Sequence, residues 1–379
     1  MFHQDMIFSH HMPTRIIWGE GSLGRLPEEV AAIKRRCLLV TGRRAARLSG
    51  LLERVQECLL SARIESVLFD QVEPNPTVDT IREGVALAQD KKARWVLAVG
   101  GGSAMDAAKA IAMMAVNEGE IREFFSGARP GHPPMPVVAV PTTAGTGSEV
   151  TPFSVLTDVS ECDKFGLAHP NLFPRLAILD PEVTVSMPEQ VTVNSGLDVL
   201  CHAVEAIFSK KRSDLSDLYA RRAIDRLATH LPVSRTEPAN LEARSGMQLA
   251  AAFAGMAIAD TATLVPHALG YPVTVRYDIP HGRATVLLLP AFLERMCDLE
   301  VQRPRAAYVG RVLGEEADPP KALRAFIEQL GVAPRLTAYG FQEKDIPMFV
   351  QQSLDKKHLG ITPGEWGEQQ LEDLYRQSL

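Results

Sequence analysis

Cysteine is scarce in this sequence: its five residues are an odd number, widely scattered, and they form no CxxC pair. Neither a disulfide framework nor a thiolate metal site is therefore expected. Basic runs are short as well, none being longer than Lys210 to Arg212, and the formal net charge is −6. Nucleic acid and membrane surfaces have no electrostatic reason to bind, which favours small-molecule chemistry.

Long hydrophobic runs are also missing. The longest apolar tracts, Met247 to Ala259 and Ala284 to Leu293, are too short or too interrupted to span a bilayer. The N-terminus has neither the basic start nor the apolar core of a secretory signal. We therefore expect a cytoplasmic protein. Its 379 residues, 46% of them hydrophobic, suffice for two domains with separate cores.

The first half of the chain alternates between strand-like and helix-like segments. Runs rich in β-branched and aliphatic residues predict strands at Cys37 to Thr41, Ile64 to Phe69, Trp95 to Val99, Pro136 to Val140 and Leu176 to Leu179. Helices are predicted at Leu48 to Ser61, Val78 to Lys91 and Ala104 to Val116. This alternation predicts a mostly parallel sheet covered on both faces. A hairpin over Phe153 to Thr157 and Lys164 to Ala168 is expected at its edge.

The strand signal nearly stops after Asp180. From Pro188 onward the pattern is helical, with caps and breakers such as Ser213 and Pro232 between the segments. We therefore predict an α/β domain over residues 1–184 and an all-helical domain over residues 185–379.

Three consecutive glycines follow the strand that is predicted to end at Val99. Gly100, Gly101 and Gly102 would let the backbone approach a ligand closely, and Ser103 could cap the next helix. The free N–H groups and the dipole of such a helix start suit a pyrophosphate. The run is neither GxGxxG nor a Walker A sequence, and a tight turn alone would explain it as well.

A second loop of small residues, PTTAGTGSEVT, follows the next strand. The hydroxyl groups of Thr142, Thr143 and Thr146 could line the same crevice, because open α/β sheets bind ligands beyond the carboxyl ends of their strands. Two such loops favour a dinucleotide. The alternative is a turn whose hydroxyl groups satisfy its own backbone.

The turn at Gly42, Arg43 and Arg44 bears on which dinucleotide binds. In nucleotide-binding folds an acidic residue near such a strand end commonly accepts from the ribose hydroxyl. A small residue followed by two guanidinium groups would instead make room for a 2′-phosphate and pair with it. This favours NADP(H) over NAD(H), although arginines in loops are commonly only solvated charges.

The stretch Asn194 to Ser209 predicts a buried helix that carries Asp198 and His202 on one face, four residues apart. A buried carboxylate beside a buried imidazole needs a partner. Two later histidines, His267 in an apolar helical segment and His281 in DIPHG, complete a possible ligand set. One carboxylate and three imidazoles suit a divalent first-row metal, and they do not separate iron from zinc.

The chain resembles the iron-dependent (group III) alcohol dehydrogenase family in four motifs, GGGSAMDAAK, PTTAGTGSEVTPFSVLTD, SGLDVLCHAVE and HALGYPVTVRYDIPHG. The similarity covers nearly the whole chain. Within the family, the chain looks most like the 1,3-propanediol dehydrogenase and lactaldehyde reductase-like members. It implies a Rossmann-like N-terminal domain and a helical, metal-binding C-terminal domain of the dehydroquinate synthase-like type. It also implies a site in the cleft between them, and at least a dimer.

The resemblance also assigns roles to individual residues. The implied ligands of iron, or of zinc, are Asp198, His202, His267 and His281. The implied cofactor-binding positions are Asn75, Gly100, Gly101, Gly102, Ser103, Asp106, Thr142, Thr143, Thr146, Val155 and Lys164, to which the strand-end argument adds Gly42 and Arg43. Phe153 and Ile258 fall on substrate-pocket positions.

Two departures from the family pattern matter. Tyr271 stands where many members carry a further histidine between the last two ligands, so the part of that histidine in proton relay does not carry over. Gly42 occupies the position of an aspartate in NAD-preferring members, in agreement with the expectation of NADP(H).

The implied activity is a metal-dependent alcohol dehydrogenase or aldehyde reductase that transfers hydride between NAD(P)(H) and a small primary alcohol or aldehyde. The metal would act as a Lewis acid, so that no side-chain base is needed. Alternatives on the same fold are a dehydroquinate synthase-like lyase and a glycerol dehydrogenase-like enzyme. A nucleotide-binding protein with a dead site would require the loss of a ligand, and all four are present.

Overall fold

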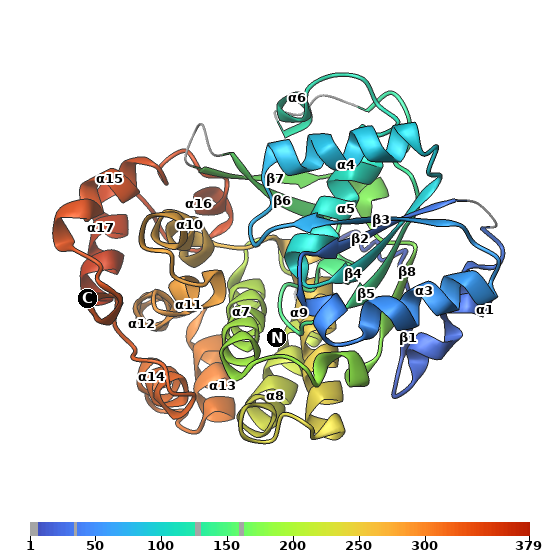
Figure 1. Ribbon diagram of the computed structural model, residues 1–379. Coiled ribbons are helices and arrows are strands. Elements are labelled where there is room, and N and C mark those ends of the chain that lie inside the picture. The colour runs from blue at the N-terminus through green and yellow to red at the C-terminus, as the bar shows by residue number, and fades with distance from the viewer. Residues whose placement is uncertain (1–6, 34–35, 126–129, 159–162) are drawn as a thin grey trace. The chain divides into compact units, whose positions relative to one another are not determined.

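The computed structural model describes residues 7–33, 36–125, 130–158 and 163–379 (Figure 1). Contacts divide the chain into two compact units. The sheet unit comprises Met12–Pro188 and Pro238–Gln248. The helical unit comprises Glu189–Glu237, Leu249–Leu379 and the described residues before Met12. The predicted boundary between residues 184 and 185 lies shortly before the division between Pro188 and Glu189.

The sheet unit is built on a six-stranded parallel sheet in the order β1-β8-β5-β4-β2-β3. The strands are β1 (Arg15–Trp18), β2 (Cys37–Gly42), β3 (Ser66–Val72), β4 (Trp95–Gly100), β5 (Val137–Pro141) and β8 (Leu176–Leu179). The five predicted strands are confirmed, and β1 is additional. Four residues at a sheet edge, none of them fully buried, give β1 too weak a pattern to predict.

Helices cover both faces of this sheet (Figure 1). They are α1 (Leu26–Val30), α2 (Ala45–Leu48), α3 (Leu51–Ser61), α4 (Val78–Asp90), α5 (Gly102–Met114) and α6 (Ile121–Phe125). Alternate residues of β2 separate the two cores: Leu38 and Val40 pack with α4 and α5, whereas Cys37 and Leu39 pack with α1 and α3. Burial on both faces explains why the strands read as continuous apolar runs.

The predicted hairpin forms, but not at the predicted place. Strands β6 (Phe153–Asp158) and β7 (Asp163–Ala168) make a separate two-stranded antiparallel sheet, whereas β1 and β3 are the edges of the main sheet. The expectation that the hairpin extends the main sheet is therefore wrong. Leu156 and Leu167 are buried in the same core as α5, so packing on that helix holds the hairpin, together with an isolated backbone bridge between Thr157 and Thr77.

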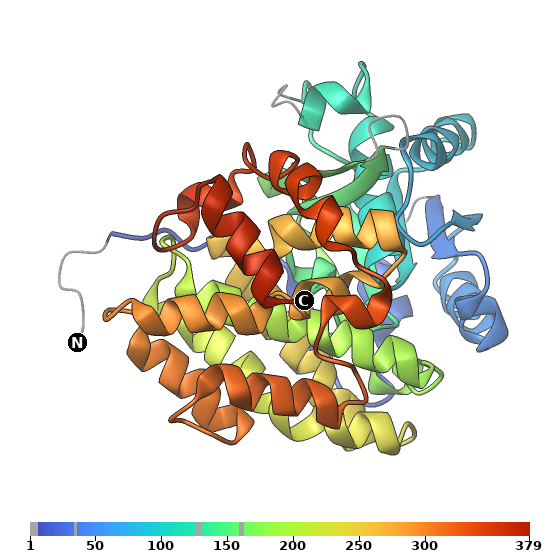
Figure 2. The ribbon, with the colours of Figure 1, turned by 90° about the vertical axis from the view of Figure 1, so that its left-hand side faces the viewer.

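The helical unit contains the C-terminal helices, drawn from light green to red in Figure 2. They are α7 (Glu189–Phe208), α8 (Asp214–Thr236), α10 (Val265–Tyr277), α11 (His281–Val286), α12 (Leu289–Asp298), α13 (Arg303–Leu313), α14 (Pro319–Gln329), α15 (Ile346–Gln351), α16 (His358–Ile361) and α17 (Glu368–Gln377). Helix α9 (Leu241–Thr261) begins in the sheet unit and continues in the helical unit.

Two of the predicted helix signals behave differently. Ser213 caps α8 as expected, since its side chain accepts from the backbone N–H of Ser216 in a capping box. Pro232 does not break the helix, because α8 continues through it to Thr236. Its buried neighbour Leu231 packs against α7, where a Cβ on Gly196 would lie 2.4 Å from a Leu231 methyl group. We infer that this packing outweighs the hydrogen bond that the proline removes.

Helix α7 is the core of the helical unit. By length and composition it could cross a membrane, with a mean hydropathy of 1.2, but 83% of that stretch is buried in the folded chain. Helix α11 approaches it closely at Gly282. A Cβ at that position would lie 2.2 Å from the carbonyl oxygen of Asn194 and 2.8 Å from the backbone nitrogen of Asp198. Only glycine fits this contact without moving one of the two backbones.

We expect Gly282→Ala to destabilise the protein by about 1–3 kcal/mol, because the added methyl group meets the backbone of α7 rather than a movable side chain. Chemical denaturation followed by circular dichroism measures this. Gly360→Ala is the matched control in the same unit, since a Cβ there meets nothing within 4 Å. Equal denaturation midpoints for the two variants would contradict the expected backbone clash.

Candidate metal and nucleotide sites

Helix α7 carries three polar side chains on one buried face. Asp198, His202 and Glu205 are spaced so that they lie on the same side of the helix. Their exposed fractions are only 5%, 6% and 0%. Because charged and polar groups are costly to bury alone, each of them requires a partner from another element.

The partners come from two helices later in the chain, α10 and α11. His267 lies in α10, and His281 is the first residue of α11. One ligand atom from each of Asp198, His267 and His281 lies within 4.8 Å of the other two, a convergence that suits a single metal ion. His267 Nε2 is 3.6 Å from Asp198 Oδ1, which is longer than a hydrogen bond. The structure thus brings together three of the four predicted ligands.

His202 adjoins this group without belonging to the convergent set. Its Nε2 lies 3.8 Å from Asp198 Oδ1, and its ring stacks on His267 with the centroids 4.7 Å apart. The residue therefore shares the buried pocket with the other three side chains. Its part as a fourth ligand stays a prediction.

The donor atoms of the cluster fit a cation. Asp198 Oδ1 and His267 Nε2 are buried, and neither has a hydrogen-bond partner among the residues that the structure describes. A divalent ion would satisfy both atoms, and imidazole nitrogen with carboxylate oxygen is a donor set for iron or zinc. The cluster is therefore better explained as a metal site than as a network of hydrogen bonds.

The electrostatics of the cluster agree with this interpretation. Burial alone would raise the pKa of Asp198, but His202, His267 and His281 together hold it below its ordinary value. Burial would lower the pKa of His267, yet the carboxylates of Glu205 and Asp198 raise it to about 9. Without a metal, a proton on His267 supplies the positive charge that the buried carboxylates need. A bound cation would replace that proton.

Glu205 is a site residue that the sequence analysis missed. Its Oε1 lies 2.6 Å from His267 Nδ1, and its Oε2 accepts from the backbone N–H of Leu264 at 2.5 Å. A carboxylate accepts the Nδ1 proton and leaves Nε2 of His267 facing Asp198. The signal was present, because Glu205 follows His202 by three residues on the same helix face.

Tyr271 and His358 lie at the border of the metal cluster. The Tyr271 ring stacks on His281 at 5.1 Å, and His358 meets Tyr271 edge-on at 6.2 Å. Burial, with the nearby His267, lowers the pKa of His358 to about 4, so this imidazole is neutral at physiological pH. The sequence analysis did not single out His358, since no motif contains it.

Of the two predicted substrate-pocket residues, Ile258 lies buried in α9 of the helical unit and Phe153 begins β6 of the sheet unit.

In the sheet unit, the glycine turn and the threonine loop lie together at the carboxyl ends of β4 and β5. A Cβ on Gly101 would lie 3.0 Å from Thr143 Oγ1, and a Cβ on Gly102 would lie 2.6 Å from a Thr146 methyl group. The N-terminus of α5 has no side-chain cap, although Ser103 was expected to supply one. Uncapped N–H groups in a cradle without side chains fit a pyrophosphate.

Lys109 fixes the loop that follows these threonines. Its side chain is fully buried, and its Nζ donates to the carbonyl oxygens of Ser148, Thr151 and Phe153 at 2.6, 2.9 and 2.8 Å. Burial lowers the pKa of Lys109 to about 8, which the nearby Asp106 and Glu149 partly offset. This lysine therefore shapes the predicted nucleotide loop from within.

Asp106 and Val155, both predicted to bind the cofactor, contact each other. Asp106 Oδ2 accepts from the backbone N–H of Val155 at 3.1 Å, and its Oδ1 accepts from Ser148 Oγ at 2.6 Å. Both carboxylate oxygens thus have partners within the protein. The geometry indicates that Asp106 positions the loop, and direct contact with a nucleotide stays a prediction.

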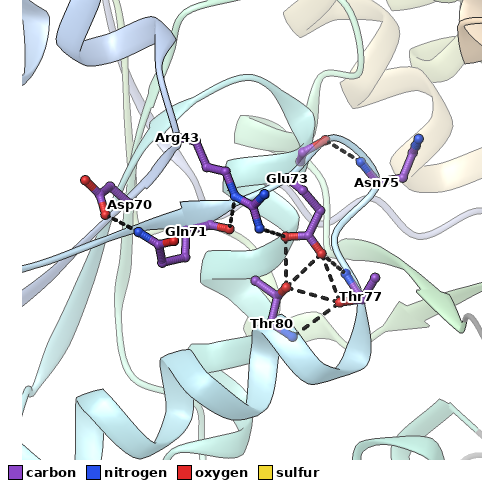
Figure 3. Close-up of polar contacts among 8 residues, drawn as sticks. Arg43, Asp70, Gln71, Glu73, Asn75, Thr77 and Thr80 are labelled. Atoms are coloured by element: carbon purple, nitrogen blue, oxygen red, sulfur yellow. Dashed lines mark hydrogen bonds and ion pairs between the residues drawn. The ribbon is translucent and has the colours of Figure 1, made fainter.

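Three further predicted cofactor residues meet across the β3–α4 loop. The backbone N–H of Asn75 donates to Ser103 Oγ at 3.3 Å, and Lys164 Nζ donates to Asn75 Oδ1 at 2.8 Å. Asn75 has a left-handed backbone conformation with φ 58°, which turns the loop back toward α5. Gly42 ends β2 on the same sheet edge, and Arg43 follows it (Figure 3).

Comparisons with known proteins show to which family the chain belongs. Residues 13–181 match the iron-containing alcohol dehydrogenase family, and residues 192–379 match the C-terminal domain of the Fe-containing alcohol dehydrogenase family. The chain is 30% identical to 1,3-propanediol dehydrogenase from Klebsiella pneumoniae over 93% of its own length and 95% of that protein. It is also 30% identical to lactaldehyde reductase from Escherichia coli strain K12, over 94% and 96%.

Solved structures share the fold of the whole chain. The crystal structure of sulfoacetaldehyde reductase from Bifidobacterium kashiwanohense in complex with NAD+ aligns with a TM-score of 0.90 and 30% identity, covering 98% of each chain. The predicted combination of an α/β dinucleotide-binding domain and a helical domain is confirmed. Sequence motifs, site geometry and relatives lead to one conclusion: this chain belongs to the iron-containing alcohol dehydrogenase family.

Proposed function

We propose that this protein transfers hydride between NAD(P)(H), with NADP(H) favoured, and a small primary alcohol or aldehyde at a site built on Asp198, His202, His267 and His281. The observation that carries the proposal is the buried convergence of Asp198, His267 and His281, with two donor atoms left without hydrogen-bond partners. Relatives named for reactions of small alcohols and aldehydes support it.

The side chains around the metal site have separate tasks. A divalent ion bound there would supply Lewis-acid chemistry at the substrate oxygen, and a bound nicotinamide would donate or accept the hydride. Asp198 supplies the negative charge of the ligand set, and Glu205 holds His267 with Nε2 free to ligate. Tyr271 covers one face of His281. The apolar side chains of Phe153 and Ile258 favour a small substrate.

The sheet unit would hold the nucleotide. The glycine turn from Gly100 to Gly102 offers backbone N–H groups to the pyrophosphate, and Thr143 and Thr146 pack directly against it. Lys109 keeps the adjoining loop in shape through its contacts with three carbonyl oxygens. Asn75 and Lys164 complete the polar edge beside Ser103.

Cofactor choice is proposed to follow from the end of β2. A Cβ on Gly42 would have Val72 O, at 3.6 Å, as its nearest neighbour, so a side chain fits there and its absence leaves room. Arg43 offers the positive charge for a 2′-phosphate. One relative is described as a complex with NAD+, which makes the preference of this chain a question for direct measurement. Assembly into at least a dimer and a cytoplasmic location stay predictions.

Asp198→Ala should abolish metal retention and lower turnover of short aldehydes by at least about a thousandfold, because it removes the only anionic ligand from a buried site. Metal content by elemental analysis and NAD(P)H oxidation measure the two effects. His132→Ala, at an exposed position of the sheet unit, should keep both. Full metal content and turnover in Asp198→Ala would refute the proposed metal site.

Glu205→Gln should weaken metal binding by about ten- to a hundredfold. With its carbonyl oxygen still accepting from Leu264 N–H, the amide would present its NH2 group to His267 Nδ1. That contact would move the imidazole proton to Nε2, the atom that must ligate. Glu149→Gln is the matched control, since it alters a buried carboxylate in the other unit and should leave metal affinity unchanged. Chelator competition measures affinity, and unaltered competition by Glu205→Gln would contradict this role.

Gly42→Asp should shift the ratio of NADPH to NADH efficiency toward NADH by at least about tenfold. A carboxylate there can accept from a ribose hydroxyl and repels a phosphate. The ratio of kcat/KM values for the two nucleotides with one aldehyde measures this. Gly42→Asn separates the effect of size from that of charge. Asparagine has nearly the shape of aspartate but carries no negative charge, so it should shift the ratio less than Gly42→Asp does. An unchanged ratio in Gly42→Asp would show that residues other than Gly42 determine the preference between NADPH and NADH.

A further inference from the structure

The guanidinium of Arg43 is already engaged by the neighbouring β3–α4 loop (Figure 3). Its Nε donates to the carbonyl oxygen of Gln71 at 3.1 Å, and its Nη2 lies 3.8 Å from Glu73 Oε2. The arginine side chain is 59% exposed, so the guanidinium also remains open to a ligand from solvent. Arg43 therefore has an internal anionic partner and an accessible face.

Glu73 is fixed in place by the start of α4 (Figure 3). Its Oε1 accepts from the backbone N–H and the hydroxyl of Thr77 at 3.0 and 2.9 Å, and from Thr80 Oγ1 at 2.7 Å. Partial burial would raise the pKa of Glu73, but the hydrogen bonds from Thr80 and Thr77 lower it. The carboxylate thus stays ionised and cannot swing away from Arg43 without losing these donors.

The position of this pair relates it to the nucleotide. Strands β2 and β4 are neighbours in parallel register, so Gly42 at the end of β2 and Gly100 at the end of β4 reach the same sheet edge. Asn75, two residues after Glu73, contacts Ser103 in the first turn of α5. A nucleotide whose pyrophosphate binds this glycine turn would extend its adenosine ribose toward the end of β2.

We propose that Glu73 competes with the 2′-phosphate of NADP(H) for the guanidinium of Arg43, and thereby sets how strongly this chain distinguishes NADP(H) from NAD(H). The inference rests on the proposed nucleotide site. A 2′-phosphate carries more negative charge than a carboxylate and would have to share the guanidinium of Arg43 with Glu73. The negative charges of the phosphate and of Glu73 would also repel each other. NAD(H) has a hydroxyl there and meets no such competition.

The neighbouring charges do not provide the same effect. Arg47 Nη2 is paired with Asp70 Oδ2 at 3.0 Å, which engages it away from Glu73. Asp70 also accepts from Gln71 Nε2 at 2.7 Å (Figure 3). Asp70 lies in β3 and Glu73 in the loop that follows it, and among the described residues Glu73 alone is ion-paired with Arg43.

The test is Glu73→Gln in the full-length protein, with nucleotide binding measured by NADPH and NADH fluorescence titration without substrate. Glutamine can still accept from Thr77 N–H, so the start of α4 is kept. We expect the Kd for NADPH to fall about three- to fivefold, and the Kd for NADH to change by less than about twofold. Asp70→Asn removes an equal charge nearby and should leave the ratio of the two Kd values unchanged.

A double mutant shows whether Arg43 mediates the effect. Arg43→Met alone should weaken NADPH binding. Adding Glu73→Gln to it should recover little of the NADPH affinity, because the guanidinium for which Glu73 and the phosphate compete is absent. A full gain from Glu73→Gln in the Arg43→Met background would overturn competition through Arg43. Weaker NADPH binding by Glu73→Gln would overturn it too, since Glu73 would then be holding Arg43 for the phosphate.

Two further outcomes separate this inference from the proposed function. If Glu73→Gln weakens NADH binding, Glu73 reads the ribose hydroxyl, and the competition is refuted while the nucleotide site stands. If the wild-type protein binds both nucleotides but reduces no aldehyde after metal loading, the proposed reaction fails, and the Kd ratios still decide the role of Glu73. Binding of neither nucleotide would overturn both.

Discussion

The buried carboxylate of Asp198 is the constraint on which the helical unit depends. It lies in the core helix, 5% exposed, where an unpaired negative charge would be strongly destabilising. His202 on the same helix cannot neutralise it alone, because burial lowers the pKa of that imidazole. Positive charge must therefore come from His267 as a proton, or from a metal ion. The close approach of α11 at Gly282, which brings His281 to the cluster, serves the same requirement.

Lys109 and Asp198 are both buried charges, but their surroundings differ in a way that supports a metal site at Asp198. Lys109 in the sheet unit is fully buried, but its ammonium group contacts oxygen atoms of Ser148, Thr151 and Phe153. Its hydrogen-bonding capacity is used within the protein, as befits a positioning residue. In the helical unit, by contrast, Asp198 Oδ1 and His267 Nε2 face each other without a hydrogen bond. Buried atoms without hydrogen-bond partners that also converge with a third ligand atom, from His281, indicate a ligand site.

Much of this architecture could be predicted from the sequence, because periodicity and ligand spacing are local properties. Five of the six strands of the central sheet, and the shared helix face of Asp198 and His202, follow from spacing alone. The placement of the β6–β7 hairpin could not be predicted, since it depends on Leu156 and Leu167 packing against α5. Glu205 was missed although it follows His202 by three residues on the same helix face. His358 could not be predicted, because its importance comes from a contact with Tyr271, far along the chain.

Cofactor choice illustrates why a single position does not decide specificity. Gly42 leaves space and Arg43 offers charge, which are the features that the sequence displays. The structure adds Glu73, whose ionised carboxylate is held beside Arg43 by the donors of α4. Under the proposed competition, the free energy available to a 2′-phosphate would be the difference between its attraction to Arg43 and its repulsion from Glu73, and each is modest at a solvent-exposed site. A preference built from opposing terms of similar size can be shifted by one substitution on either side, without any change in the fold.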